Sequence, residues 1–324
     1  MPHVETLRGP VDTAQLGFTL MHEHVFVLSQ GVPENFPSIW NEKEEVVAAQ
    51  ERLRELAALG VQTIVDLTVL GLGRDIPRLR RAVGDVPLNV IVATGLYLYT
   101  DEELPRFFRS RDADAMADLF ARDITEGIQD TEVKAAIIKC ATDEGGVTPG
   151  VDKVLRAAAR AHRRTGVPIS THTHAVTRRG LEQQEIFEQE SVDLSRVIIG
   201  HSGDTEDLDY LQALMKKGSY IGMDRFGIDI YLSTEKRVAT IARLCELGYA
   251  EQMVLSHDAS CYIDWYPAEL IRRNVPNWHY GHISEEVLPA LRAAGVGEEQ
   301  IRQMTVESPR RIFERQGAYQ EPEQ

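Results

Sequence analysis

Eight short apolar runs, most of them rich in β-branched residues, recur along the chain with one longer amphipathic segment between successive runs. Most runs are continuously apolar rather than alternating, which is typical of parallel strands covered on both faces. The predicted strands occupy residues 18–22, 61–67, 88–94, 135–140, 167–172, 196–201, 219–223 and 253–257. Eight strand–helix units in a chain of 324 residues predict an α/β fold of the (β/α)8 TIM-barrel type.

The segments between the predicted strands carry recognisable helix ends. A predicted helix at 42–59 is followed by Gly60, and a second one begins after Thr148 and ends at Gly166. No linker rich in Pro, Gly or Ser interrupts the pattern, so residues 1–324 are expected to form a single barrel domain. The alternative is an open doubly wound sheet, which calls for a Gly-rich phosphate-binding turn after the first strand. Histidines stand at that place instead.

Charge and composition exclude several classes of partner. The chain has 35 basic and 50 acidic residues, a net charge of −15, and no basic block suited to a phosphate backbone, so we expect no nucleic-acid partner. No apolar run reaches the ~18 residues of a membrane-spanning helix, and the first 18 residues lack the apolar core of a secretion signal. Cys140, Cys245 and Cys261 are widely spaced and odd in number, which argues against a disulfide framework. We therefore expect a cytoplasmic protein without a membrane partner.

Two histidines flank one acidic residue at the end of the first predicted strand, in the order His22, Glu23, His24. Alternate side chains of a strand share a face, so His22 and His24 can face one ion while Glu23 points away. This is the geometry of a metal site. The alternative is a pair of unrelated core or surface histidines. Glu23 itself is expected to lie behind the strand, paired with a neighbouring group and without a direct part in the chemistry.

Four further groups that can bind a metal, or can be converted to do so, close other predicted strands: Lys139, His172, His201 and Asp258. In a TIM barrel the loops after the carboxyl ends of the strands converge on one face, where active sites lie. Each residue alone has an ordinary alternative; His201, for example, could be satisfied by the backbone of a turn. The matching positions of the whole set indicate one site.

Lys139 requires a chemical change before it can be a ligand, because an ammonium group has no lone pair. Burial at the end of an apolar strand favours the neutral amine, which can add carbon dioxide. The product, a carbamate, is an anion with two oxygens that can bridge two metals. The alternative is an ordinary lysine that extends to solvent or pairs with Asp143 or Asp258.

Seven short motifs together resemble the phosphotriesterase family of the amidohydrolase superfamily, and more closely its branch of phosphotriesterase-like lactonases. The resemblance extends from about residue 6 to residue 316. The motifs are LMHEHV at 20–25, ATGLY at 93–97, KC at 139–140, THTH at 171–174, GHSGD at 200–204, GMDRFG at 222–227 and SHDA at 256–259. All six ligand positions of the family are present.

The resemblance implies a centre of two divalent metal ions, expected to be zinc, with cobalt, manganese or iron as alternatives. The two metals would share a bridging hydroxide that acts as the nucleophile, and Asp258 would accept its proton. His174, His257, His279 and His282 receive no ligand role. The implied ligands are His22, His24 and Asp258 for the more buried metal, His172 and His201 for the more exposed one, and N6-carboxylated Lys139 as the bridge.

The resemblance also implies the walls of the substrate pocket. Tyr97 would be catalytic, touching the hydroxide or the leaving oxygen, and Arg225 would lie at the pocket mouth. In this family, a tyrosine at the position of Tyr97 favours lactones over phosphotriesters. The other implied substrate-binding residues are Tyr99, Phe226, Cys261, Trp265 and Trp278. The two tryptophans could instead clamp the long loop at 259–283, for which the sequence predicts no regular structure.

The implied function is a lactonase that hydrolyses N-acyl-homoserine lactones, and so quenches quorum signals, together with other γ- and δ-lactones. Weaker hydrolysis of organophosphate triesters is expected as a side activity. The alternatives are a dedicated aryldialkylphosphatase and a metal-binding barrel without useful turnover. Many relatives are homodimers, so a homodimer is expected; Phe107 and Phe108 could pack against a second subunit or belong to the core.

Overall fold

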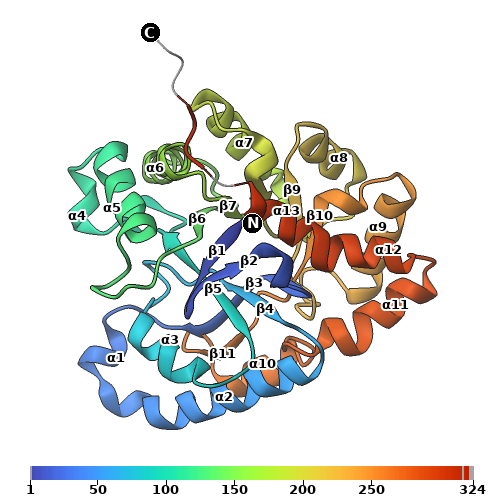
Figure 1. Ribbon diagram of the computed structural model, residues 1–324, viewed down its shortest axis with the longest axis horizontal. Helices are drawn as coiled ribbons and strands as arrows, with labels where there is room; N and C mark the ends of the chain where they lie inside the picture. Colours follow the sequence, from blue (N-terminus) through green and yellow to red (C-terminus); the bar gives the residue numbers. More distant parts are fainter. Residues whose placement is uncertain (1, 316, 321–324) are drawn as a thin grey trace.

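The computed structural model of the protein describes residues 2–315 and 317–320. Its centre is a barrel of parallel strands with helices around it (Figure 1). The eight barrel strands are β3 (Thr19–Val27), β4 (Thr63–Asp66), β5 (Asn89–Gly95), β6 (Ile137–Thr142), β7 (Ile169–Thr173), β8 (Val197–Ile199), β9 (Tyr220–Met223) and β10 (Met253–Leu255). Each overlaps one of the eight predicted strands, so the predicted (β/α)8 fold is confirmed.

Helices fill the connections between the strands and cover the outside of the barrel (Figure 1). The longer ones are α2 (Glu42–Ala58), α3 (Ile76–Val83), α5 (Ala113–Thr125), α6 (Pro149–Thr165), α7 (Arg179–Gln189), α8 (Leu208–Lys216) and α9 (Thr234–Glu246). The shorter ones are α1 (Val32–Asn35), α4 (Arg106–Arg109), α10 (Ala268–Asn274), α11 (Leu288–Ala293), α12 (Glu298–Arg302) and α13 (Ser308–Glu314). Among the described residues, no helix is both long and apolar enough to cross a membrane.

The ends of α6 follow from the local sequence. The Thr148 hydroxyl accepts a hydrogen bond from the Val151 N–H, Pro149 occupies the first turn, and Gly166 ends the helix in the left-handed conformation. The predicted helix at 42–59 is observed as α2, which ends one residue earlier than predicted. Of the aromatic pair near α4, Phe108 is buried in the core, while Phe107 is exposed and lies under Arg111.

An N-terminal hairpin and the last helix close the amino-terminal end of the barrel. The hairpin consists of β1 (His3–Thr6) and β2 (Gly9–Asp12), which pair antiparallel. Figure 1 views the barrel from this side, with the hairpin and α13 over its centre. Val4 of the hairpin and Phe313 of α13 join the apolar side chains that fill the barrel. The site must therefore open at the opposite, carboxyl-terminal end.

The seam between the first and last barrel strands differs from a regular ladder. The hydrogen-bonded order runs from β10 through β9, β8, β7, β6, β5 and β4 to β3. Across the seam, the Asp258 N–H donates to the His22 carbonyl (3.0 Å) and the His22 N–H donates to the Ser256 hydroxyl (2.8 Å). The loop after β10 thus closes the barrel, and it carries one of the candidate ligands.

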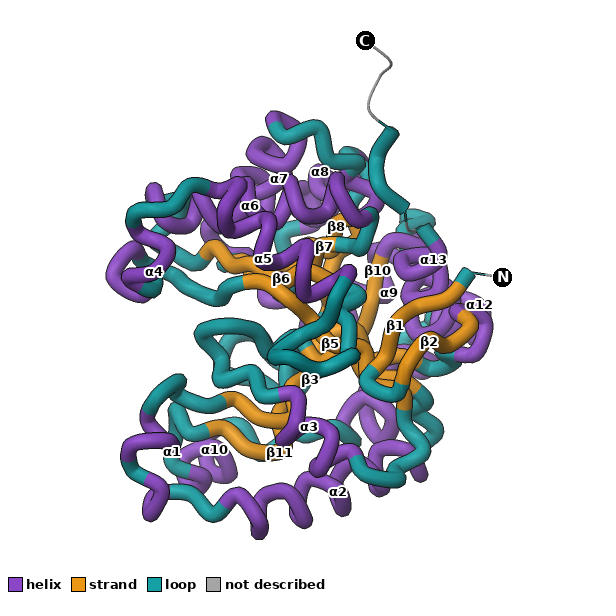
Figure 2. The backbone as a smooth tube through the Cα atoms, turned by 60° about the vertical axis from the view of Figure 1, so that its left-hand side comes forward, coloured by secondary structure: helices purple, strands orange, loops and turns teal. Residues whose placement is uncertain are grey.

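Two expectations for this region were wrong. β3 does not end near His22 but continues to Val27, because a ninth strand, β11 (Ser260–Ile263), pairs with its extension (Figure 2). The loop at 259–283 is not irregular, since it contains β11 and α10. The pairing partners of β11 lie more than 200 residues away along the chain, so local sequence could not reveal this strand.

Candidate metal centre

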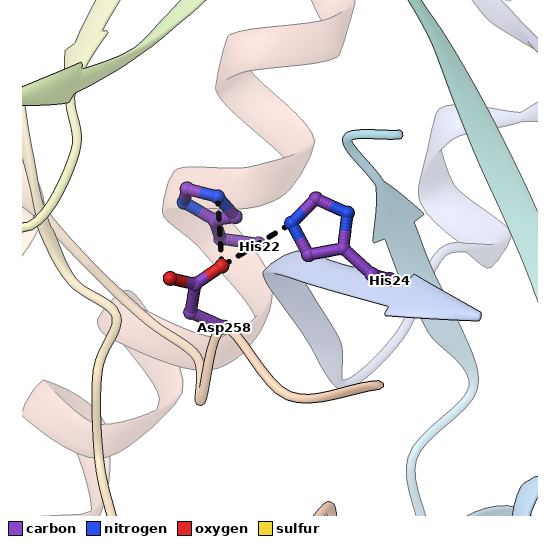
Figure 3. A group of neighbouring side chains, drawn as sticks. All are labelled: His22, His24 and Asp258. Atoms are coloured by element: carbon purple, nitrogen blue, oxygen red, sulfur yellow. Dashed lines mark hydrogen bonds and ion pairs between the residues drawn. The ribbon is translucent and has the colours of Figure 1, made fainter. Parts of the chain in front are cut away.

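Three of the candidate ligands meet at the seam of the barrel. His22 and His24 point inward from β3, and Asp258 approaches from the loop after β10 (Figure 3). The Asp258 Oδ1 atom lies 3.4 Å from His22 Nε2 and 3.2 Å from His24 Nε2. All three ligand atoms lie within 4.8 Å of one another, which is a separation that one ion can bridge.

Two further histidines extend this group across the barrel. His172 lies near the carboxyl end of β7, and His201 follows β8. Their ring centroids are 4.5 Å apart, and the His201 ring stacks on that of His22 at 4.7 Å. His201 Nε2 lies 3.7 Å from the second carboxylate oxygen of Asp258. The Asp258 carboxylate therefore lies between His22 and His24 on one side and His201 on the other.

Lys139 lies inside the site and is almost fully buried. Its Nζ atom is 2.9 Å from His22 Nε2, and it does not extend to solvent. Burial lowers the pKa of Lys139 to about 8, so a substantial fraction of the amine is neutral near pH 8. Of the two alternatives for this residue, the position excludes a lysine that extends to solvent.

Asp224 orients two of the imidazoles at once. His22 Nδ1 donates to one of its carboxylate oxygens (2.9 Å), and His201 Nδ1 donates to the other (3.0 Å). Burial raises the pKa of Asp224, but His22 and Lys139 outweigh this effect and lower it, so the carboxylate is ionised and accepts both bonds. With their Nδ1 atoms protonated, His22 and His201 present the Nε2 lone pairs to the site.

The other two imidazoles are oriented in the same way by different partners. His24 Nδ1 donates to the Thr68 hydroxyl (2.9 Å), which in turn donates to the Phe26 carbonyl (3.5 Å). His172 Nε2 contacts the Asp143 carboxylate at 3.3 Å, which leaves its Nδ1 atom facing the site. Every imidazole of the group thus has its outward nitrogen engaged and its inward nitrogen available to a metal.

The protonation states suit metal ligands. Burial lowers the pKa of His172 to about 4 and that of His201 well below its ordinary value. Burial also lowers the pKa of His22. These imidazoles are neutral at pH 7 and retain a lone pair each. Four imidazoles, one carboxylate and one convertible lysine form a donor set that fits a pair of divalent ions.

Two of the candidate ligands have a strained backbone. His201 has a φ of 56° and Asp258 a φ of 55°, in the left-handed region that residues other than Gly rarely adopt. The His201 N–H donates to Asp224 (2.7 Å), the same carboxylate that holds its ring. Strain of this kind persists only where surrounding contacts hold it, and it is concentrated at functional sites.

A cavity of about 420 Å³ opens above these ligands. Of the expected substrate-binding residues, five line it: Tyr97, Tyr99, Arg225, Trp265 and Trp278. The structure does not bring Phe226 and Cys261 to it. Phe226 is fully buried in the core, and the Cys261 sulfur faces the Tyr280 hydroxyl (3.5 Å) on the side of α2. Phe226 lies in the turn after β9 and packs into the core. Cys261 follows Ser260, which lines the cavity, and successive residues of β11 face opposite sides.

Arg225 lies deeper than the expected position at the pocket mouth. Its Nε donates to Asp258 (3.0 Å) and its Nη1 to Asp204 (3.0 Å), so the guanidinium is held between two carboxylates. Burial raises the pKa of Asp258, but His22, His201 and Arg225 outweigh this and keep it well below its usual range. Asp258 is therefore an ionised group at neutral pH.

Tyr97 and Tyr99 place their hydroxyls together beside His172. The two hydroxyls are hydrogen-bonded to each other, and the Tyr97 hydroxyl is 3.3 Å from His172 Nδ1. Burial raises the pKa of both phenols, so both keep their protons at neutral pH. The site thus has neutral hydrogen-bond donors next to the inward nitrogen of His172.

Comparison with known proteins shows the family to which this chain belongs. The sequence profile of the Phosphotriesterase family matches residues 2–313. The chain belongs to the phosphotriesterase family. It is 56% identical to the phosphotriesterase homology protein of Mycobacterium tuberculosis over 99% of this chain and 100% of that protein. It is 44% identical to an aryldialkylphosphatase of Saccharolobus solfataricus over 94% of this chain and 98% of that protein.

The fold agrees with this assignment. The solved structure of the phosphotriesterase from M. tuberculosis matches with a TM-score of 0.95 at 55% sequence identity, over 98% of this chain and 100% of the other. Proteins of the phosphotriesterase family are metal-dependent hydrolases with two metals, and the His and Asp groups described above are able to hold such ions. This protein is therefore a hydrolase.

The sequence does not predict the residues that hold the candidate ligands and Arg225 in place. Asp224 and Asp204 stand in the motifs at 222–227 and 200–204, but no role was expected for either. Asp143 contacts His172 rather than pairing with Lys139, and the sequence gives no signal for the contact of Thr68 with His24. An acidic residue next to a ligand-bearing strand end was the available signal; its partner became visible only with the fold.

Proposed function

We propose that this protein is a lactonase that acts on N-acyl-homoserine lactones and other γ- and δ-lactones. The observation that carries the proposal is the Tyr97 hydroxyl, a protonated phenol 3.3 Å from the inward nitrogen of His172. Ring opening of a lactone releases an alkoxide, which needs a hydrogen-bond donor and then a proton. Tyr97 is placed to donate to this oxygen at the edge of the metal centre.

The residues that would hold the proposed metal centre are His22, His24, His172, His201, Asp258 and a carboxylated Lys139. Two divalent ions held by such a set would supply an activated water as nucleophile and would polarise the oxygen of the substrate's reacting group. Lys139 is suited to carboxylation because burial favours its neutral amine. Zinc is the metal we expect, since it accepts imidazole and oxygen ligands alike.

Asp258 carries the proton in the proposed mechanism. Its carboxylate is ionised at neutral pH and lies among the inward nitrogens, so it is able to accept the proton released by the attacking water. The leaving alkoxide of an opened lactone remains attached to the product and stays in the site. Asp258 then returns the same proton to that oxygen. Arg225 holds the carboxylate oxygen Oδ2 in position during both transfers.

The wall of the pocket fits a substrate with an apolar tail. Apart from the candidate ligands, the cavity is lined by apolar residues that include Val27, Leu72, Ile263, Trp265, Leu270 and Ile271. Few polar groups lie on this wall, so an acyl chain would be bound by apolar contact and with modest selectivity. The polar groups are concentrated at the metal centre, where the ring of the lactone would lie.

A second candidate function has one specific observation in its favour. A relative with 44% identity is named aryldialkylphosphatase, and the same centre could polarise a phosphoryl oxygen. Aryl leaving groups need no proton, so an enzyme dedicated to them gains little from a phenol at Tyr97. We therefore propose triester hydrolysis as a weaker side activity.

The decisive experiment compares both reactions in metal-replete and chelated protein. We expect metal-dependent ring opening of N-acyl-homoserine lactones with a kcat/KM well above that for a paraoxon-like triester. Equal or greater efficiency on the triester would reverse the order of the two functions. Loss of all turnover on both substrates, with both metals bound, would support a binding protein instead.

A further inference from the structure

Glu23 lies between two metal-ligand candidates but faces the other side of β3, where it is completely buried. Its carboxylate accepts four hydrogen bonds from the loop after β10. The donors are the Ser256 hydroxyl (2.9 Å), the His257 N–H (3.0 Å), the His257 Nδ1–H (2.6 Å) and the Ala259 N–H (2.9 Å). These donors come from both sides of one residue, Asp258.

The backbone of Asp258 needs such support. Its φ of 55° is unfavourable for a residue with a side chain, and in this conformation the carboxylate lies 3.2 Å from His24 Nε2 and 3.4 Å from His22 Nε2. The N–H groups of His257 and Ala259, one on each side, are buried and have Glu23 as their acceptor. Without that acceptor, the strained loop would also hold two buried, unpaired donors.

The neighbouring contacts fix the direction of each bond to Glu23. His257 Nε2 accepts a hydrogen bond from the Ile283 N–H (3.0 Å), so the proton of this imidazole is on Nδ1 and is donated to Glu23. The Ser256 hydroxyl accepts from the His22 N–H (2.8 Å) and donates to Glu23. Glu23 therefore also ties the loop to β3 at the seam of the barrel.

We propose that Glu23 is a positioning residue that holds Asp258 in the metal centre. The carboxylate acts through the backbone of residues 257 and 259 and touches neither metal nor substrate. The proposal rests on the proposed role of Asp258 as a ligand, and it adds a function for the residue between the two histidines. In this protein that residue sets the geometry of a third candidate ligand, which comes from the loop after β10.

Glu23→Gln tests the proposal with little change of shape. An amide has one oxygen, so its NH2 group must face either the Ala259 N–H or the three donors on the other oxygen. We expect the affinity for the tighter-binding Zn²⁺ to fall about 10- to 100-fold, as is usual when a group that orients a metal ligand is lost. Competition with a chromogenic chelator measures this affinity without any assay of activity.

Asp123→Asn is the matched control. Asp123 is a partly buried carboxylate that accepts hydrogen bonds from two side chains, Arg74 (2.7 Å) and Thr94 (2.6 Å), and it does not line the active-site cavity. We expect its Zn²⁺ affinity to equal that of the wild type. If Asp123→Asn lost as much Zn²⁺ affinity as Glu23→Gln, general destabilisation would explain the effect and the proposal would be overturned.

A double-mutant cycle separates positioning from a merely structural role. In an Asp258→Asn background the ligand is already lost, so Glu23→Gln should weaken Zn²⁺ binding by less than about twofold. An equal loss in both backgrounds would overturn the proposal. If Glu23→Gln does not fold, Glu23→Asp takes its place in the cycle, because it keeps a carboxylate but shortens its reach to the four donors. The same criterion then applies.

The metal-free variant gives a direct structural readout. A crystal structure of Glu23→Gln should show residue 258 outside the left-handed region, whereas an unchanged φ would contradict the proposal. Neither this measurement nor the affinity cycle depends on lactone turnover. An inactive wild type would therefore overturn the proposed function while leaving the role of Glu23 to be decided by these two measurements.

Discussion

The metal centre and the outer wall of its pocket are held in very different ways. Each imidazole of the centre is fixed at its outer nitrogen by a carboxylate or a hydroxyl. The outer wall consists of loop side chains, several of them partly exposed, such as Trp265, Tyr266 and Ile230. The centre is thus built from directional bonds and the wall mainly from apolar contacts. This difference predicts that mutations in the centre act on metal binding and rate, and mutations in the wall act on substrate choice.

The largest effect is expected from Lys139→Ala. The substitution removes the proposed bridging group, and metal-assisted catalysis contributes several kcal/mol, so activity should fall by about 10³-fold or more, together with metal content. Metal analysis and a ring-opening assay measure both. Small carboxylic acids such as formate should restore part of each by filling the space. If the variant keeps its metals and its rate without added acid, the carbamate proposal fails; Lys139→Met is a control of similar length that cannot be carboxylated.

A smaller loss is expected from Asp224→Asn, which changes only the orienting contacts. His22 Nδ1 and His201 Nδ1 bond to different oxygens of Asp224, and an amide replaces one of these acceptors with an NH2 donor, so one of the two rings loses its fixed tautomer. We expect affinity for both metals to fall about 10- to 100-fold, measured by chelator competition. An unchanged affinity would show that packing alone orients these rings and would weaken the contrast between centre and wall.

The same contrast explains how far the sequence predicts the structure. The barrel strands could be located because each is a short apolar run, and the six ligand candidates meet because they follow strand ends in a closed barrel. The partners of those ligands could not be assigned, since His22 and Asp224 are 202 residues apart in the chain and their contact depends on the tertiary structure. The hairpin β1–β2 and β11 were missed for a similar reason: they are four-residue strands whose pairing is set by the fold.

The wall was predicted less well than the centre. Tyr97, Tyr99 and Arg225 line the cavity, but Cys261 faces α2, although Ser260 next to it lines the cavity. Which of two neighbouring residues faces the pocket depends on where β11 begins, and the sequence does not indicate this strand. Local patterns predict strands and strand ends; the face presented by an irregular loop depends on its packing.

Tyr97→Phe lies at the boundary between the two regions. The phenyl ring preserves the wall, and no outer hydrogen bond of an imidazole is lost, so metal affinity should be unchanged. The loss of one hydrogen bond to the leaving oxygen is worth about 1–1.5 kcal/mol, which predicts a fall in kcat of about tenfold. Steady-state kinetics on a lactone measure it. An undiminished kcat would exclude a catalytic hydroxyl; a triester with an aryl leaving group, which needs no donor, serves as the control substrate.

The smallest effect is expected from Trp265→Ala. Trp278→Phe serves as the comparison variant. Both tryptophans line the cavity, but the Trp278 Nε1–H donates to the carbonyls of His257 (3.1 Å) and Asp258 (3.0 Å), so this residue clamps the loop that carries a ligand. Trp265 lies on the exposed side and contacts the Tyr97 ring at a centroid distance of 6.2 Å. Its loss should raise KM for long-chain lactones about threefold to tenfold through lost apolar contact, with metal affinity and short-chain kinetics unchanged. Trp278→Phe should instead weaken metal binding and so reduce turnover of lactones of every acyl-chain length. If both variants changed only chain-length preference, the indole N–H of Trp278 would belong to the wall and the division between the two regions would have to be redrawn.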